Sequence, residues 1–379
     1  MVWRSQKAVL NRFFLTKAPK MKPEIYATII GSGSYLPTKH VPNSNFLERT
    51  FLESNGASIN RPNEEIIRKF QQITGIDERR YVEDEYVCSD IAFFAAEKAI
   101  ADAGIDKETL DYIIVAHNFG DVKSGATHSD LVPALASRVK HKLAIENPFT
   151  VAYDLPFGCP GWLQAVIQAN YYIKSGDAKK ILVIGSETLS RVSDPHDRDS
   201  MIYSDGAGAV VLSATESETP VGILAHVTRT DTIEQAYLLK MDRSFNPEDK
   251  ENLYLKMNGR KLYEYALKTV PSAIKMAIDK SGIPIQQIER ILIHQANEKM
   301  DEAIVTRLYE LYGYAQRPEF SMPMTISWLG NNSVATLPIL FDLISHRKLE
   351  NYNLNSGEYF AFASVGAGMH VNALVYKLP

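Results

Sequence analysis

The chain contains two stretches with the same order of features, and this internal repeat constrains its fold more than any other property of the sequence. Residues 99–118 and 277–296 lie 178 positions apart, and each contains the end of a helix, a glycine and then an apolar strand. A glycine just past a periodic apolar segment is typical of a helix C-terminus. A chain built from two such copies is expected to form two similar halves.

Two further pairs of motifs follow in the same order. The turn that contains Cys159 precedes an apolar helical pattern, and the turn that contains Asn331 precedes another apolar run. The glycine-rich sequences 206–208 and 366–368 each precede an apolar strand. Three matched pairs in one order indicate an internal duplication. The equivalent turns of the two halves are therefore expected to meet at one central place.

Each half alternates helices with apolar strands, and this pattern predicts an α/β fold of mixed sheets covered by helices. We expect the first half to span residues 22–213 and the second to span residues 214–379, with one shared core. Two polar, turn-rich segments, residues 42–65 and 241–252, are predicted to be surface loops.

Residues 1–21 differ from the rest of the chain because they carry five basic side chains and no acidic one. We expect a disordered basic extension without catalytic residues, or a stretch that precedes the true start at Met21. A mitochondrial-type presequence is the alternative.

The composition of the 379 residues argues against several classes of protein. Apolar residues make up 45% and charged residues 23%, which is ordinary for a globular protein. The net charge of −4 argues against nucleic acid as the main partner. The two cysteines cannot form a disulfide framework and fit a reducing cytoplasm. No window reaches the roughly 20 apolar residues of a membrane span, and no cluster has the spacing of metal ligands.

Cys159 is the strongest candidate for a nucleophile. It stands between Gly158 and Pro160-Gly161, and glycines permit a strained turn that exposes the side chain. The start of a helix favours the thiolate through the helix dipole and unpaired N–H groups. The alternative is a small buried apolar residue, which is the usual role of a lone cysteine. Cys88 lacks such a turn and is expected to be structural.

His294 and Asn331 complete a candidate site for acyl transfer on cysteine. His294 follows the apolar strand 291–293, where the first half has only Ala116, and it could polarise the group that a thiolate attacks. Asn331 is the counterpart of Cys159 in the repeat and supplies an amide donor. The alternatives are a satisfied core histidine and an asparagine that serves only the turn.

At these residues the chain resembles the β-ketoacyl-acyl-carrier-protein synthase III family of thiolase-fold condensing enzymes. The match runs from about residue 25 to residue 379. The segments that carry it are residues 30–37, residues 74–80, the Cys159 turn, residues 204–209, His294-Gln295-Ala296-Asn297 and Gly330-Asn331. The resemblance implies a thiolase-like, duplicated α-β-α-β-α layered fold with two pseudo-symmetric halves, assembled as a homodimer and without a cofactor.

The resemblance also implies a reaction in two steps. The Cys159 thiolate would take an acyl group from a thioester, with the backbone N–H groups of Cys159 and Ala367 as the oxyanion hole. His294 and Asn331 would then hydrogen-bond to the carbonyl of a malonyl-type thioester as carbon dioxide leaves. The resulting enolate would attack the acyl group on Cys159 and release a β-ketoacyl thioester.

The chain departs from the family where the family binds coenzyme A. Lys69 and Ile73 occupy the positions of a Trp and an Arg that hold the adenine, and Lys299 replaces an Arg. Lysine lacks the planar group that grips phosphate or stacks on rings. These departures favour a donor carried by acyl carrier protein. Val132 stands where short-primer members insert a bulky aromatic from the partner subunit, so we expect an acyl pocket for a medium or long chain.

Four residues are predicted to bind the carrier protein or its phosphopantetheine arm. They are Arg260, Lys261, Asn297 and Lys299. The positive side chains among them suit an acidic partner, because surface charges steer association.

The same departures leave other functions open. One is a ketosynthase that joins two acyl chains on the way to dialkylresorcinol or aryl-polyene lipids. Some such relatives use a carboxylate of the partner subunit as a base, and Asp130 is the candidate here. A non-condensing acyltransferase and a non-catalytic scaffold subunit are the others, and the intact set of Cys159, His294 and Asn331 argues against the scaffold.

Overall fold

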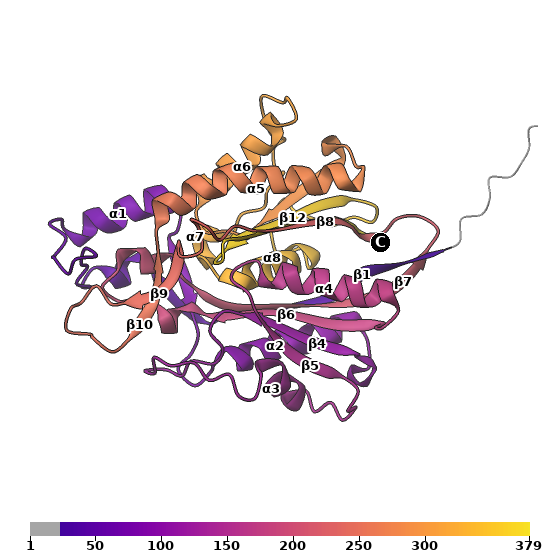
Figure 1. Cartoon of the computed structure of the whole chain (residues 1–379), viewed down its shortest axis with the longest axis horizontal. Coiled ribbons are helices and arrows are strands. Elements are labelled where there is room, and N and C mark those ends of the chain that lie inside the picture. The colour runs from indigo at the N-terminus through magenta and orange to yellow at the C-terminus, as the bar shows by residue number, and fades with distance from the viewer. Residues whose placement is uncertain (1–22) are drawn as a thin grey trace, which may run out of the picture.

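The computed structural model describes residues 23–379, which form two large β-sheets with helices on both faces of each (Figure 1). The predicted basic extension, residues 1–21, lies outside the described residues. No helix within residues 23–379 is both long enough and apolar enough to cross a bilayer.

The two sheets repeat the same strand order. The first runs β1 (Glu24–Tyr35), β7 (Asp205–Ser217), β6 (Lys180–Thr188) and β4 (Tyr112–His117), and the second runs β8 (Gly222–Thr230), β13 (His370–Lys377), β12 (Tyr359–Gly366) and β11 (Ile288–Ile293). In both sheets the first two pairings are antiparallel and the third is parallel. A fifth strand, β5 (Val151–Pro156), pairs with β4 in parallel at the edge of the first sheet.

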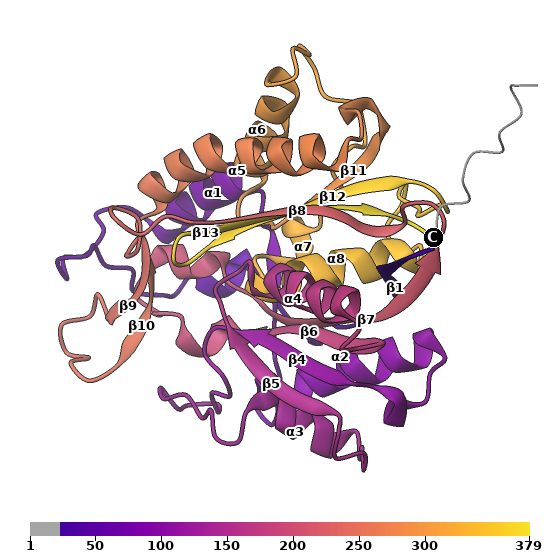
Figure 2. The ribbon, with the colours of Figure 1, turned by 45° about the vertical axis from the view of Figure 1, so that its right-hand side comes forward.

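Helices and sheets alternate in five layers (Figures 1 and 2). The middle layer consists of α4 (Gly161–Ser175) and α8 (Thr336–Ser345), whose side chains contact both sheets. The outer face of the first sheet is covered by α2 (Cys88–Ala103) and α3 (Leu135–Lys142). The outer face of the second sheet is covered by α5 (Gly259–Ser281) and α6 (Glu298–Glu310).

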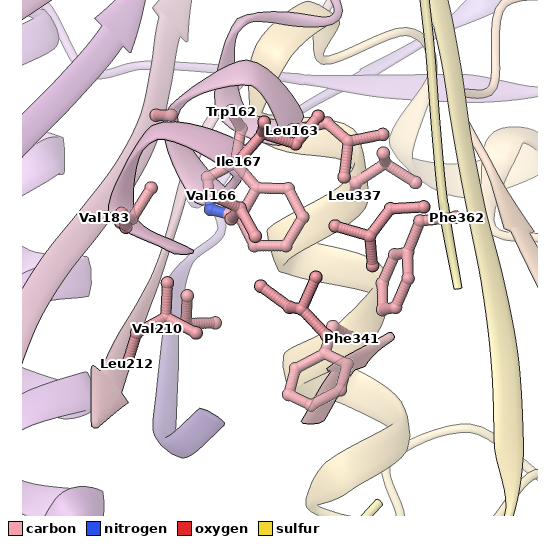
Figure 3. Packing of buried hydrophobic residues seen from close by; sticks show 14 of the residues in the cluster. Trp162, Leu163, Val166, Ile167, Val183, Val210, Leu212, Leu337, Phe341 and Phe362 are labelled. Carbon is pink, nitrogen blue, oxygen red and sulfur yellow. The ribbon is translucent and has the colours of Figure 1, made fainter. Parts of the chain in front are cut away.

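The sequence of the middle layer explains its position. Every residue from Thr336 to Ile344 is buried and all but Thr336 and Asp342 are apolar, and a helix with so little polar surface belongs in the interior. Figure 3 shows Trp162 of α4 and Phe341 of α8 between Val183 on the first sheet and Phe362 on the second. The ring of Phe362 lies 6.2 Å from that of Trp162 and 6.1 Å from that of Phe341, centroid to centroid.

One buried carboxylate ties the middle layer to the first strand. Asp342 of α8 accepts hydrogen bonds from the hydroxyl groups of Ser32 at 3.0 Å and Ser34 at 2.6 Å, both on β1. His346 and Lys348 approach the same carboxylate at 3.0 and 3.5 Å. A buried charge needs such partners, so these contacts fix the position of α8 relative to β1.

The prediction of an α/β fold with mixed sheets under helices is confirmed, and so is the layered order that the family resemblance implied. The proposed boundary between residues 213 and 214 falls inside β7 (Asp205–Ser217). A division at that residue would cut the strand, and the exact boundary between the two halves stays a prediction.

The smaller elements lie around one end of the sheets. They are β2 (Lys39–Pro42), β3 (Glu78–Tyr81), α1 (Asn63–Thr74), α7 (Ile326–Leu329) and the hairpin of β9 (Leu239–Arg243) and β10 (Leu253–Met257). The surface loop predicted at residues 241–252 is thus only partly a loop. Its first residues belong to β9, because five residue pairs between Leu239 and Met257 form a regular antiparallel ladder.

The aromatic contacts of the middle layer give a test of the core. Phe362→Ala is expected to lower the free energy of unfolding by about 3–5 kcal/mol, because it leaves a cavity among three aromatic rings. Phe362→Leu keeps most of the volume and should cost less than about 1.5 kcal/mol. Ile233→Ala is the control, since Ile233 is 96% exposed and should matter by less than about 0.5 kcal/mol. Chemical denaturation measures all three, and equal losses for the two Phe362 variants would contradict this account.

Candidate active site

Cys159 lies in the turn between β5 and α4, and this turn packs against a second glycine turn at the end of β12. A Cβ atom at Gly366 would lie 2.6 Å from the backbone nitrogen of Cys159. A Cβ atom at Gly158, whose φ is +26°, would lie 2.9 Å from the carbonyl oxygen of Ala367. Only glycine at both positions allows this approach. The contact brings the backbone of Ala367 beside Cys159; its role in an oxyanion hole, which the family resemblance implied, stays a prediction.

Cys159, Asn331 and Ala367 line one cavity of about 210 Å³. The predicted equivalence of the Cys159 and Asn331 turns therefore has a spatial counterpart. The other lining residues are Asn118, Phe119, Leu189, Tyr203 and Ser333, with Leu239, Lys240, Met241 and Leu255 from the β9–β10 hairpin. The hairpin is thus a wall of this cavity.

Asn331 is held by its backbone and by its own side chain. Its N–H donates to the carbonyl of Ile202 at 3.0 Å, and its carbonyl accepts from the N–H of Ser204 at 2.9 Å. Its side-chain oxygen accepts the backbone N–H of Ser333 at 2.8 Å. Because the oxygen is already engaged, the amino group is the end of the amide that remains to donate.

His294 follows β11 directly and is buried, with 3% of its surface exposed. Its backbone N–H donates to the carbonyl of Ala363 at 2.9 Å. Burial lowers the pKa of the imidazole to about 4, and a hydrogen bond with the backbone of Ser333 only partly opposes that shift. His294 is therefore neutral at physiological pH and carries one ring N–H, which either the backbone of Ser333 or a substrate carbonyl can accept. Its Nδ1 has no hydrogen-bond partner within residues 23–379.

The ionisation of Cys159 differs from the sequence expectation. Burial raises the pKa of the thiol to about 11, and the charge of Glu187 acts in the same direction. A hydrogen bond from the Ser333 hydroxyl, 3.4 Å from Sγ, opposes the rise. The prediction that the turn favours the thiolate is wrong. A helix end stabilises a thiolate by only about 0.3–1 kcal/mol, and the desolvation of the sulfur outweighs this.

Sequence reasoning missed three polar residues around the sulfur: Ser333, Asn118 and Glu187. The Ser333 hydroxyl contacts Sγ directly, Asn118 donates to Ser333, and Glu187 accepts from Asn118. The positions of Asn118 and Glu187 at the ends of apolar strands were the signal that could have indicated them. Asn118 follows β4, and Glu187 is the penultimate residue of β6, so both stand at the carboxyl edge of parallel strands, where ligand sites form.

The second cysteine behaves as the sequence analysis expected of a structural residue. Cys88 is fully buried, and its thiol donates to the Ser186 hydroxyl at 3.2 Å. Burial raises the pKa of this thiol well above its usual value.

Val132 and Asp130 lie on an exposed loop that lines neither cavity within residues 23–379. Val132 is 85% exposed. Asp130 forms an ion pair with Arg138 at 2.7 Å, and this contact lowers the pKa of the carboxyl group. A carboxylate with a lowered pKa is a weak base, which counts against the role suggested for Asp130.

A second cavity of about 980 Å³ lies between α1, the start of α5 and the start of α6. Lys69, Ile73, Arg260 and Asn297 line it. Asn297 caps α6, accepting the N–H of Met300 at 3.0 Å.

The two predicted lysines lie elsewhere. Lys261 and Lys299 are exposed and do not line the large cavity within the described part of the chain. The structure therefore brings only Arg260 and Asn297 of the predicted carrier-binding set into one cavity. No group of three or more His, Cys, Asp or Glu side chains among residues 23–379 is arranged to hold a metal ion.

Comparison with known proteins gives the same family from family models and from a curated relative. Residues 153–232 match the family model of 3-oxoacyl-[acyl-carrier-protein] synthase III, and residues 278–378 match the model of its C-terminal domain. The chain is 31% identical to a β-ketoacyl-[acyl-carrier-protein] synthase III from Staphylococcus haemolyticus over 92% of this chain and 98% of that protein.

Solved structures agree with this result. The 3-oxoacyl-[acyl-carrier-protein] synthase III of Aquifex aeolicus is 28% identical, with a TM-score of 0.74 over 93% of this chain and 99% of that one. The priming β-ketosynthase of the R1128 polyketide pathway has a TM-score of 0.75 over 96% of this chain and 98% of that one; at 24% identity it shows the fold alone. The chain belongs to the β-ketoacyl-[acyl-carrier-protein] synthase III family and is a condensing enzyme of the acyltransferase type.

Proposed function

We propose that this enzyme carries an acyl group on Cys159 and condenses it with a malonyl-type thioester held by His294 and Asn331. The observation that carries the proposal is the contact of the two glycine turns, which puts Cys159 and Ala367 at one cavity with Asn331. A nucleophile, backbone donors and an amide donor at one cavity are the parts that acyl transfer requires.

In the first step, Sγ of Cys159 attacks the carbonyl carbon of an acyl thioester. The N–H groups of Cys159 and Ala367 stabilise the oxyanion. The carbon–sulfur bond of the donor then breaks, and the departing thiol takes the proton that Cys159 gives up. Net proton uptake is zero, so a Cys159 thiol with a pKa of about 11 can react without lasting ionisation.

In the second step, the malonyl-type thioester loses carbon dioxide and the bonding electrons pass to its thioester carbonyl. Neutral His294 and the amino group of Asn331 each donate a hydrogen bond to the enolate oxygen. The enolate carbon attacks the acyl carbon on Cys159, the carbon–sulfur bond breaks, and the sulfur leaves as thiolate, which takes up one proton from solvent. Decarboxylation supplies the carbanion, so no separate base is needed.

We propose further that the acyl donor is a medium- or long-chain thioester of acyl carrier protein. Lys69 and Ile73, at the two positions predicted to meet adenine, offer neither a ring nor a planar guanidinium. Phe70, Tyr263 and Arg198 line the same cavity, so the argument concerns those two positions alone. The exposed Lys261 and Lys299 suit an acidic protein surface. Arg260 is paired with Glu264 at 3.1 Å, so the two lysines carry more of this argument.

We also propose a homodimer formed along β5. This strand pairs only with β4, and its other edge is open within the described residues. An open strand edge invites pairing with a second chain. Apolar side chains gather nearby, namely Leu131 at 48%, Val132 at 85%, Phe149 at 84% and Val151 at 47% exposure. Such a dimer would cover this patch and could bring Val132 to the site of the partner.

The covalent step is tested first. Incubation with acyl-carrier-protein thioesters, followed by mass spectrometry, should show an acyl adduct on Cys159. Cys159→Ala should abolish the adduct, and the matched Cys88→Ala variant should keep it. His294→Ala and Asn331→Ala should still form the adduct but make β-ketoacyl product on the order of 100- to 1,000-fold more slowly, because each loses a preorganised donor. An adduct without β-keto product in the parent protein would reduce the function to acyl transfer.

Donor preference is tested by rate. Medium- or long-chain acyl carrier protein should acylate Cys159 much faster than acetyl-coenzyme A, and added salt should slow the reaction because charges are screened within about 8–10 Å at 0.1–0.15 M. Lys261→Glu should slow acylation from the carrier protein but not from a small acyl thioester without a protein. Lys179→Glu is the matched control, since Lys179 is exposed just before β6, at the end of the sheet opposite Cys159. Efficient acetyl-coenzyme A priming would refute the proposal.

The dimer is tested by light scattering. The parent protein should have the mass of two chains at micromolar concentration. Phe149→Asp should shift it toward the monomer, because it puts a charge into the apolar patch, whereas Ile233→Asp should not, although Ile233 is equally apolar and 96% exposed. A monomeric parent would overturn this part of the proposal.

A further inference from the structure

A continuous chain of hydrogen bonds connects the sulfur of Cys159 to a buried carboxylate. The Ser333 hydroxyl donates to Sγ at 3.4 Å, and the side-chain amide of Asn118 donates to the Ser333 oxygen at 3.0 Å. The same amide nitrogen also donates to Glu187. The backbone N–H of Asn118 donates to that carboxylate oxygen at 2.9 Å. The condensation steps derived above use none of Ser333, Asn118 and Glu187.

The direction of each bond follows from the chemistry of the groups. An ionised carboxylate can only accept, so the amide group of Asn118 that faces Glu187 must be its NH₂. Its second hydrogen then points to Ser333, whose oxygen accepts it. The hydroxyl group has only one hydrogen, and Sγ of Cys159 is the neighbour left to receive it. Followed from the carboxylate to the sulfur, these bonds leave the Ser333 hydroxyl as the donor to Sγ of Cys159.

The backbone supports the same arrangement. Ser333 has a φ of +52°, a conformation that residues other than glycine rarely adopt. Its backbone N–H is held by the side chain of Asn331 at 2.8 Å. A residue other than glycine keeps a positive φ only where the surrounding contacts determine its position. Here these contacts direct the Ser333 side chain toward Cys159.

The negative charge of Glu187 is the reason that the Cys159 sulfur needs the Ser333 hydroxyl as a donor. Glu187 is completely buried, and its negative charge raises the pKa of Cys159 while the Ser333 hydrogen bond lowers it. The titratable groups that face Glu187 are His117, Asp205, Cys88 and Cys159. Only His117 among them could bear a positive charge; it lowers the pKa of Glu187, and its ring contacts the N–H of Gly120 and Asp154.

We propose that Ser333 is a catalytic hydrogen-bond donor to the Cys159 thiolate and that Asn118, anchored by Glu187, is a positioning residue for the Ser333 hydroxyl. The donor stabilises the sulfur as it loses its proton to the departing thiol and again when the sulfur leaves the acyl carbon. This inference rests on the proposed role of Cys159 as the nucleophile, but the reactivity of its thiol can be measured without any acyl substrate.

The test is the rate at which iodoacetamide alkylates Cys159, followed by peptide mass spectrometry from pH 7 to 9.5. Only the thiolate reacts. Ser333→Ala should slow alkylation about tenfold at each pH, equivalent to a rise of about one pKa unit. Ser333→Gly should act alike and tolerates the positive φ, so it serves if the alanine variant does not fold. Both variants enlarge the cavity, so an effect of access alone would speed the reaction.

The positioning role is tested by a double-mutant cycle. Asn118→Ala should slow alkylation by about threefold, since the hydroxyl remains but is free to rotate. Asn118→Ala combined with Ser333→Ala should be no slower than Ser333→Ala alone, because Asn118 acts only through Ser333. Ser186→Ala is the matched control: it removes a buried hydroxyl beside Glu187 that contacts Cys88, and it should leave Cys159 unchanged.

The outcomes separate this inference from the proposed function. Alkylation in a folded Ser333 variant as fast as in the parent overturns the donor role, and additive effects of the two substitutions overturn the positioning role of Asn118. Slower alkylation together with no acyl adduct in the parent would support the hydrogen-bond chain and refute acyl transfer on Cys159.

Discussion

The burial of α4 and α8 between two sheets is the constraint on which the rest of the structure depends. Both helices bury side chains on two faces, so their positions are fixed by the cores on either side. The turns that lead into them carry Cys159 and Asn331 and line one cavity. The site is therefore a consequence of packing, since a shift of either helix would separate the two turns.

The same packing determines the electrostatics of the site. Burial raises the pKa of Cys159 to about 11 and of Glu187 to about 7, and it lowers that of His294 to about 4. All three shifts favour the neutral form of the group. The site at rest therefore has a neutral thiol and a neutral imidazole, and hydrogen-bond donors stabilise the charge that develops during the reaction.

The sequence was sufficient for the fold but not for the ionisation of the candidate site residues. The alternation of helices and apolar strands in each half predicted an α/β fold of mixed sheets under helices, because apolar periodicity and glycine stops are local signals, and the family resemblance added the layered order. The glycines beside Cys159 predicted a strained turn, and the structure shows that they also allow the close approach of the turn at Ala367. The ionisation of Cys159 depends on its surroundings in the fold, and the cavity there is lined in part by residues 239–241 and Leu255, which are far along the chain in a segment partly predicted to be a surface loop. Likewise, the contact of Asn118 with Ser333 joins residues 215 positions apart.

The pKa shifts of His294 and Glu187 determine which of the two changes its ionisation in the physiological pH range. His294, with a pKa of about 4, stays neutral from pH 5 upward, so its ionisation has little influence in the physiological range. Glu187 has a raised pKa near 7, so its carboxylate form predominates only above that pH. Its charge fixes the direction of the Asn118 amide and, through it, the Ser333 hydroxyl. Of the groups connected to the sulfur, the one that titrates near neutrality is therefore not one of the three side chains that the sequence assigned to the chemistry, but the carboxylate at the far end of the hydrogen-bond chain.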